Sequence, residues 1–104
     1  MILLAKLKSE EAKRTLSSTP PEKAFWVNNG PVLKSVIELA TAAKKLTDRQ
    51  FMHHVNKTKN DFAKWVGEVI SDSELAKRIC KVKTKEDLAK VVTDRLKQLQ
   101  KMLK

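Results

Sequence analysis

The chain has 104 residues, of which 41% are apolar and 33% charged, and its formal net charge is +10. This length predicts one domain with a single modest core. The single cysteine, Cys80, excludes an intramolecular disulfide, and the apolar run from Met1 to Ala5 is too short for a signal peptide or a membrane span. We therefore expect a cytoplasmic protein with no membrane association.

The N-terminal third is expected to hold an arm and a small turn. Residues 2–16 predict a short helix with a weak apolar pattern, and the serines and prolines after it end the helix. We treat residues 1–23 as an N-terminal arm with a proline linker and residues 24–104 as a helical domain. At 25–34, Asn-Gly between two apolar runs predicts a hairpin, which is short because a proline follows, or only a turn.

The remainder of the domain is predicted to be helical from its capping residues. Each of four signatures is followed by apolar residues at helical spacing, and they stand at Ser35 to Glu38, Thr47 to Gln50, Ser71 to Glu74 and Thr84. They predict helices over about 36–46, from Thr47 toward Asn56, from Ser71 through Cys80, and over 85–103. The fold class is therefore all-α, a compact bundle of about five helices with a possible hairpin or turn near its N-terminus.

The stretch from Phe51 to Val69 holds both histidines and the most specific polar grouping of the chain. Its middle, residues 56–61, has no apolar side chain, and asparagine and aspartate break helices internally but cap them at the start. The pattern predicts a helix ending near Asn56, a tight corner, and a new helix starting at Asn60 or Asp61. Its structural motif is expected to comprise His54, Asn56, Asn60, Asp61 and Trp65, with His54 partly buried near Asn60, His53 exposed and Trp65 in the core.

The same stretch carries a family resemblance. The order is an aromatic residue, Asn29-Gly30, a Ser-x-x-Glu-Leu helix, Phe-x-x-His-Val-Asn at 51–56, Lys-Asn-Asp-Phe-x-x-Trp-Val at 59–66, and Leu75-Ala76. It resembles a small, functionally uncharacterised helical domain family of archaea and some bacteria, over roughly residues 25–95. The resemblance implies a compact helical domain and no particular activity.

Catalytic and metal sites are not predicted. Adjacent side chains on a helix diverge by roughly 100°, so His53 and His54 are poorly placed to share one ion, and no i, i+4 ligand pair is present. Cys80 follows Leu75 and Ile79 on an apolar side, which predicts a packed core thiol. With two glycines in the chain, a phosphate-binding loop is not expected either. We expect a non-catalytic protein without cofactor or metal.

Lysines are the most informative functional feature. Residues 34–60 carry +4 (six Lys/Arg against two acids) and residues 81–104 carry +5 (eight against three), whereas residues 61–80 carry −1 (three against four). Clustered positive charge of this kind is typical of proteins that bind phosphate backbones. The scarcity of arginine argues against base-specific readout. We predict a nucleic-acid-associated module that contacts DNA or RNA backbones without sequence preference, alone or in a nucleoprotein assembly. The residues expected to bind are Lys57, Lys59, Lys81, Lys83, Lys85, Lys90 and Lys97.

The alternative prediction is a protein-interaction adaptor. An apolar edge of the last helix at Leu96, Leu99, Met102 and Leu103, or the N-terminal arm, would lie in a groove of a protein partner. The same edge is equally consistent with a cover for the core of the domain itself.

Overall fold

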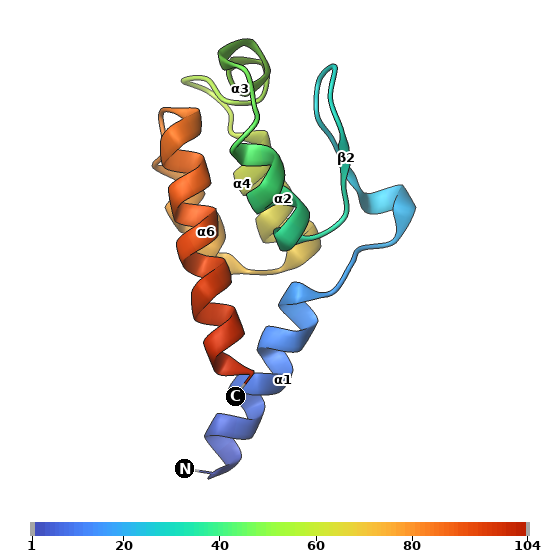
Figure 1. Ribbon diagram of the computed structural model, residues 1–104, viewed down its shortest axis with the longest axis vertical. Helices are drawn as coiled ribbons and strands as arrows, with labels where there is room; N and C mark the ends of the chain where they lie inside the picture. Colours follow the sequence, from blue (N-terminus) through green and yellow to red (C-terminus); the bar gives the residue numbers. More distant parts are fainter. Residues whose placement is uncertain (1, 104) are drawn as a thin grey trace.

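The computed structural model describes the backbone of residues 2–103 and the side chains of residues 8–103 (Figure 1). Over this part of the chain, six α-helices form the fold together with a small two-stranded sheet, which stands at one side beside the helix that follows it in sequence. In order, the elements are α1 Ile2–Leu16, the 3₁₀ turn η1 Pro21–Lys23, β1 Phe25–Trp26, β2 Val32–Leu33, α2 Val36–Ala43, α3 Asp48–His54, α4 Asp61–Trp65, the π-helical turn η2 Val66–Ile70, α5 Ser73–Cys80 and α6 Lys85–Met102.

The fold is mainly helical, as predicted, but the hairpin makes it not strictly all-α. Phe25 pairs with Leu33 and Trp26 with Val32 in antiparallel register. The turn between the strands uses the left-handed conformation at Asn29, with φ of 54°, and not at Gly30. A Cβ atom at Gly30 would lie 2.8 Å from the Gln50 side-chain nitrogen and 3.0 Å from a Val27 methyl group, so a larger residue here would require these side chains to shift.

One apolar core joins the hairpin to α2 through α6. Its fully buried side chains come from every part of the domain and include Val36, Leu39, Phe62, Val66, Leu75, Ile79, Leu88 and Val92. Trp65 is also in this core, as expected, and its indole N–H donates to the Lys23 carbonyl at 2.8 Å. Burial of these side chains is the main source of stability, and the indole bond fixes the end of the linker on the bundle.

Capping residues explain where the helices begin. Ser35, Thr47, Asn60 and Thr84 each accept a hydrogen bond from the backbone N–H three residues later, and Thr47 with Gln50 forms the complete predicted capping box. The prediction that Ser71 caps a helix is wrong. Ser71 ends η2 in a left-handed conformation with φ of 65°.

Asp72 is the residue that caps α5. Its carboxylate accepts from the Leu75 N–H at 3.2 Å and is also held by two hydrogen bonds from Arg95 of α6, at 2.8 and 3.1 Å. Because Asp72 is 5% exposed, this bidentate pair compensates a buried charge. It fixes the start of α5 against the middle of α6.

The expected core position of Cys80 is also wrong, because its side chain is exposed. Leu75 and Ile79 are buried and lie four residues apart on one side of α5. Cys80 follows Ile79 by one residue and is therefore rotated by roughly 100° around the helix, off the buried side.

The N-terminal arm forms α1, which crosses the C-terminal half of α6 at the end of the molecule where both termini lie (Figure 1). Ala12 and Thr15 are buried on α1, and Leu99 of α6 is 2% exposed. The linker after α1 runs beside β2, where the Thr19 N–H donates to the Lys34 carbonyl at 2.7 Å. No helix among the described residues is long and apolar enough to cross a membrane.

Candidate functional site

The corner between α3 and α4 is built by the side chain of Asn56. Its Oδ1 accepts three hydrogen bonds, from the Thr58 N–H, the Thr58 hydroxyl and the Lys59 N–H, at 2.8 to 3.0 Å. The Asn56 N–H donates to the Lys59 carbonyl at 2.9 Å and closes the turn. This asparagine-centred turn leaves Lys57 and Lys59 exposed.

His54 anchors the corner to the hairpin and to the core. The Asn28 N–H can only donate, so Nε2 of His54 accepts at 3.0 Å and carries no proton, and Nδ1–H donates to Asp61 Oδ2 at 2.9 Å. The ring is 6% exposed and contacts the rings of Phe25 and Phe62, with centroids 4.9 and 5.3 Å away. Both ring nitrogens of this neutral histidine are therefore used for structure, while His53 is exposed, as predicted.

Asp61 is the electrostatic partner of this corner. Burial works to raise the pKa of Asp61, but hydrogen bonds from His54 and Lys59 and the nearby charges outweigh burial, so the pKa lies below its ordinary value. Lys59 Nζ lies 3.2 Å from Asp61 Oδ2. The carboxylate is therefore held ionised by neighbours on two sides.

Asn60 joins the corner to a second loop. Its Oδ1 accepts from the Ala63 N–H and caps α4, and its Nδ2 donates to the Ile79 carbonyl at 2.8 Å. Ile79 lies just before the connection between α5 and α6, residues 81–84. One side chain thus ties together two loops that are 19 residues apart in sequence.

Between these two loops lies an open groove of about 630 Å³, here called the lysine groove. Four predicted lysines, Lys57, Lys59, Lys81 and Lys83, line it, and no aspartate or glutamate does. The other lining residues are Phe51, Met52, Val55, Asn56, Thr58, Asn60, Cys80 and Val82. The fold therefore concentrates positive charge on a concave surface.

The other predicted lysines are placed differently. Lys85 Nζ lies 3.6 Å from Asp48 Oδ1, and Lys90 pairs with Asp94 at 3.1 Å, so a carboxylate offsets each charge. Lys90 and Lys81 line a neighbouring hollow with Asp87. Lys97 lies 12 residues beyond Lys85 on α6, about 18 Å at 1.5 Å per residue. The set thus divides into four lysines around one groove and three outside it.

Sequence reasoning missed Arg49 and Met52 of α3. Both line a second hollow of about 620 Å³, here called the α3 hollow, together with Asn28, Asn29 and His53. Helical spacing was the available signal. Phe51 and His54 form the buried side of α3. Arg49 and Met52 are three residues apart and lie together on the outer side of the same helix. Met52 also lines the lysine groove and is 67% exposed.

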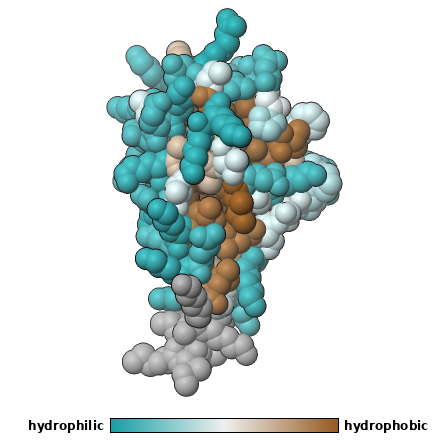
Figure 2. Space-filling model, viewed as in Figure 1, coloured by the Kyte–Doolittle hydropathy of each residue, from teal (hydrophilic) through white to brown (hydrophobic). Residues whose placement is uncertain are grey.

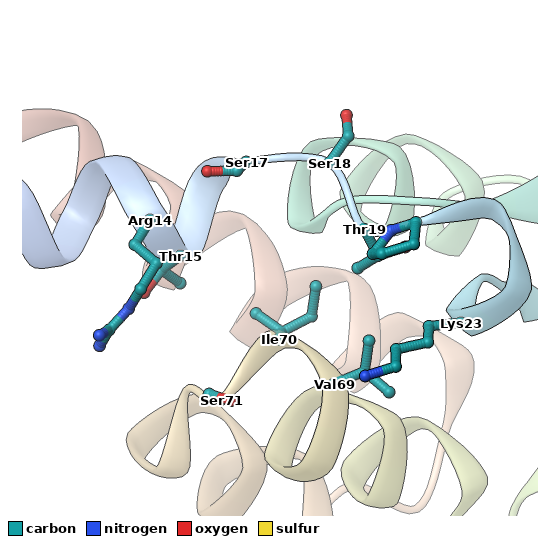
Figure 3. Close-up of a pocket in the computed structure, with 10 residues that line it drawn as sticks. Arg14, Thr15, Ser17, Ser18, Thr19, Lys23, Val69, Ile70 and Ser71 are labelled. Carbon is teal, nitrogen blue, oxygen red and sulfur yellow. The ribbon is translucent and has the colours of Figure 1, made fainter.

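Two further hollows have different chemistry. A groove of about 580 Å³ lies between the hairpin and α2. Its lining includes apolar residues, Val32, Ile37, Ala42 and Leu46, but also Glu38 and Lys45. Figure 2 shows apolar side chains exposed on this face of the molecule. The other, of about 410 Å³, lies where the linker passes η2. Figure 3 shows Arg14 and Lys23 coming from opposite sides of Ile70 and Val69 there.

The apolar edge predicted on the last helix is largely covered. Leu99 is buried, Leu96 packs against the core, and Leu103 is 40% exposed. Since α1 contacts α6, this edge packs mainly within the chain itself.

Comparisons of the chain with protein-family models, curated proteins and solved structures find no match. The family resemblance of the central motif therefore stays a prediction. Among residues 8–103, whose side chains are described, no three His, Cys, Asp or Glu residues are grouped as a metal site would require.

Proposed function

We propose that this protein is a non-catalytic nucleic-acid-binding module that uses the lysine groove to contact phosphate backbones without sequence preference. One observation carries the proposal: Lys57 and Lys59 from one loop and Lys81 and Lys83 from another line the same groove, and no carboxylate lines it. Lysine is a mobile point charge that suits phosphates in many geometries. Binding would release counterions from the nucleic acid, which is the driving force expected for such contacts.

The local chemistry favours an anionic partner over a role in solubility. Lys59 is the only one of the four with an ion-pair partner among the described residues, so three ammonium groups are uncompensated within one hollow. Like charges that line one hollow repel one another, and an anion bound between them would relieve this repulsion. Elsewhere on the chain, Lys85 and Lys90 are paired with acids.

The test is a fluorescence-anisotropy titration of the full chain with a labelled oligonucleotide over a range of salt concentrations. We expect a Kd of about 10⁻⁴ to 10⁻⁶ M near physiological salt, and a logarithmic salt slope of about −2 to −4, if two to four phosphates are contacted. The double variant Lys81→Gln/Lys83→Gln should reduce the slope by about two. No binding at low salt, or an affinity that salt does not change, would reject the proposal.

The matched control is Lys97→Gln/Lys101→Gln. It removes the same charge from exposed positions on the C-terminal half of α6, so it tests whether location matters or only net charge. We expect it to retain most of the affinity. Equal weakening by both double variants would mean that the groove is not the site.

A protein-interaction role is the second candidate. The observation in its favour is the apolar groove between the hairpin and α2, next to Ile37, which is 46% exposed, and not the predicted edge of α6. It becomes the leading proposal if the titration detects no nucleic-acid binding.

A further inference from the structure

We propose that the lysine groove and the α3 hollow together form one track for an unpaired nucleic-acid strand, with phosphates at the lysines and Arg49 and a base on Met52. This inference rests on the proposed nucleic-acid binding and adds the class of nucleic acid. It extends the site across α3 to residues that the lysine pattern does not include.

The two hollows are continuous with each other. Met52 lines both of them, so they meet at this side chain. No aspartate or glutamate lines either hollow, and with Arg49 the formal charge of the lining rises from +4 to +5. The groove beside the hairpin and the hollow next to Lys90 each contain an acid, and the hollow where the linker passes η2 has no acid but only two basic residues, Arg14 and Lys23. The track is therefore distinguished by the amount of its positive charge.

Apolar side chains also line the positively charged groove. Met52 is 67% exposed, and Val55, Cys80 and the largely buried Val82 line the lysine groove together with the four lysines. Phosphates gain nothing from such a surface. A duplex hides the faces of its bases, whereas an unpaired strand offers them for stacking. A flexible thioether makes favourable contacts with aromatic rings, so Met52 fits a base.

The walls of the track are fixed before a ligand binds. Gln50 Nε2 donates to the carbonyls of Asn28 and Asn29 at 3.1 and 3.2 Å, which holds the hairpin turn against α3. On the other side, Asn56 closes the corner that carries Lys57. Preorganised walls lower the ordering cost of binding, and Arg49, Met52 and His53 lie on neighbouring positions of one turn of α3.

The experiment compares single-stranded and duplex probes bound by the full chain at one salt concentration. Labelled oligo-dT and oligo-U of about 15 nucleotides, long enough to fill the site of a typical single-strand-binding domain, are titrated beside a DNA hairpin with the same number of phosphates. We expect at least one single strand to bind about tenfold more tightly than the hairpin, the size of one stacked base. The two single strands separate DNA from RNA.

Two variants locate the base and the added phosphate contact. Met52→Ala should weaken single-strand binding by about threefold to tenfold and leave hairpin binding nearly unchanged. Arg49→Gln should weaken single-strand binding and reduce its salt slope by about one. Ile37→Ala is the matched control, because it shortens an exposed apolar side chain outside the track.

The outcomes separate this inference from the proposed function. Equal binding of hairpin and single strands, or preference for the hairpin, overturns the track while nucleic-acid binding stands. Single-strand preference that Met52→Ala does not reduce also overturns it, because the base would then lie elsewhere. If no probe binds, both proposals fail.

Discussion

The two loops that carry the groove lysines are held in place by different means. The corner at 56–60 is fixed by its own polar side chains, with Asn56 closing the turn and His54 and Asp61 bonded beneath it. The connection at 81–84 relies on backbone bonds, from the N–H groups of Lys81 and Val82 to carbonyls of α5, and on burial of Val82. The turn of the corner is therefore closed by its own residues, whereas the connection depends on α5 and on Asn60.

Replacing His54 should disrupt the corner at 56–60 and cause the largest loss of stability. His54→Ala removes a ring packed against Phe25 and Phe62 and leaves the Asn28 N–H without its acceptor. The cavity and the unsatisfied donor together should lower the free energy of unfolding by about 3 kcal/mol. Urea denaturation at neutral pH measures it.

His53→Ala is the matched control, since the neighbouring ring is exposed. Its effect should stay within about 0.5 kcal/mol. Similar losses for both variants would contradict the assignment of the structural role to His54 alone.

Much of the corner at 56–60 could be predicted from sequence because the hydrogen bonds that close its turn and cap α4 are short-range. The cap at Asn60, the end of α3 near the corner, and the burial of His54 and Trp65 all follow from residues within a few positions of one another. The error at Ser71 had a local cause too. Serine and aspartate stand side by side, and only the left-handed turn that ends η2 shows which one caps α5.

The site was less predictable because it depends on contacts between distant segments. The lysines were visible as charge, but no pattern indicates that Asn60 bonds to the Ile79 carbonyl. This contact joins the two loops whose lysines line one groove. The charge pattern likewise does not separate Lys85, which turns to Asp48 across the fold. Tertiary pairing decides which members of a basic set share a surface.

Removing the hydrogen bond that joins the two loops should cause an intermediate loss of stability. Asn60→Ser retains a good helix cap but removes the donor to the Ile79 carbonyl. We expect a loss of about 1 to 2 kcal/mol in stability. The connection that carries Lys81 and Lys83 should then move more freely, and oligonucleotide affinity should fall by more than the change in folded fraction explains.

Ser35→Ala provides a control of similar cost, because it removes the cap of α2 without touching either loop. Its expected loss of stability is about 1 kcal/mol, with unchanged affinity. If the two variants reduce affinity equally, the Asn60 link does not organise the groove.

The smallest expected effect is the pH dependence that Asp61 gives to the corner. Its pKa is lower in the folded protein than in the unfolded chain, so the folded state binds the proton less readily. The carboxylate therefore stabilises the fold fully at pH values above its unfolded pKa, about 3.9, and this contribution is lost as pH falls through the folded pKa. Because its side chain is 33% exposed, solvent screening should keep the contribution below about 1 kcal/mol.

Asp61→Asn separates this contribution from that of the other acids. The amide keeps an oxygen that can accept from His54 Nδ1 but has no titrating proton. Urea midpoints of the two proteins should differ most near neutral pH and converge as the pH falls through the folded pKa of Asp61. A difference between the midpoints that stays constant or grows with acid would mean that the charge of Asp61 does not stabilise the corner. The packing and hydrogen bonds of the Asp61 side chain would then be what holds the corner at 56–60.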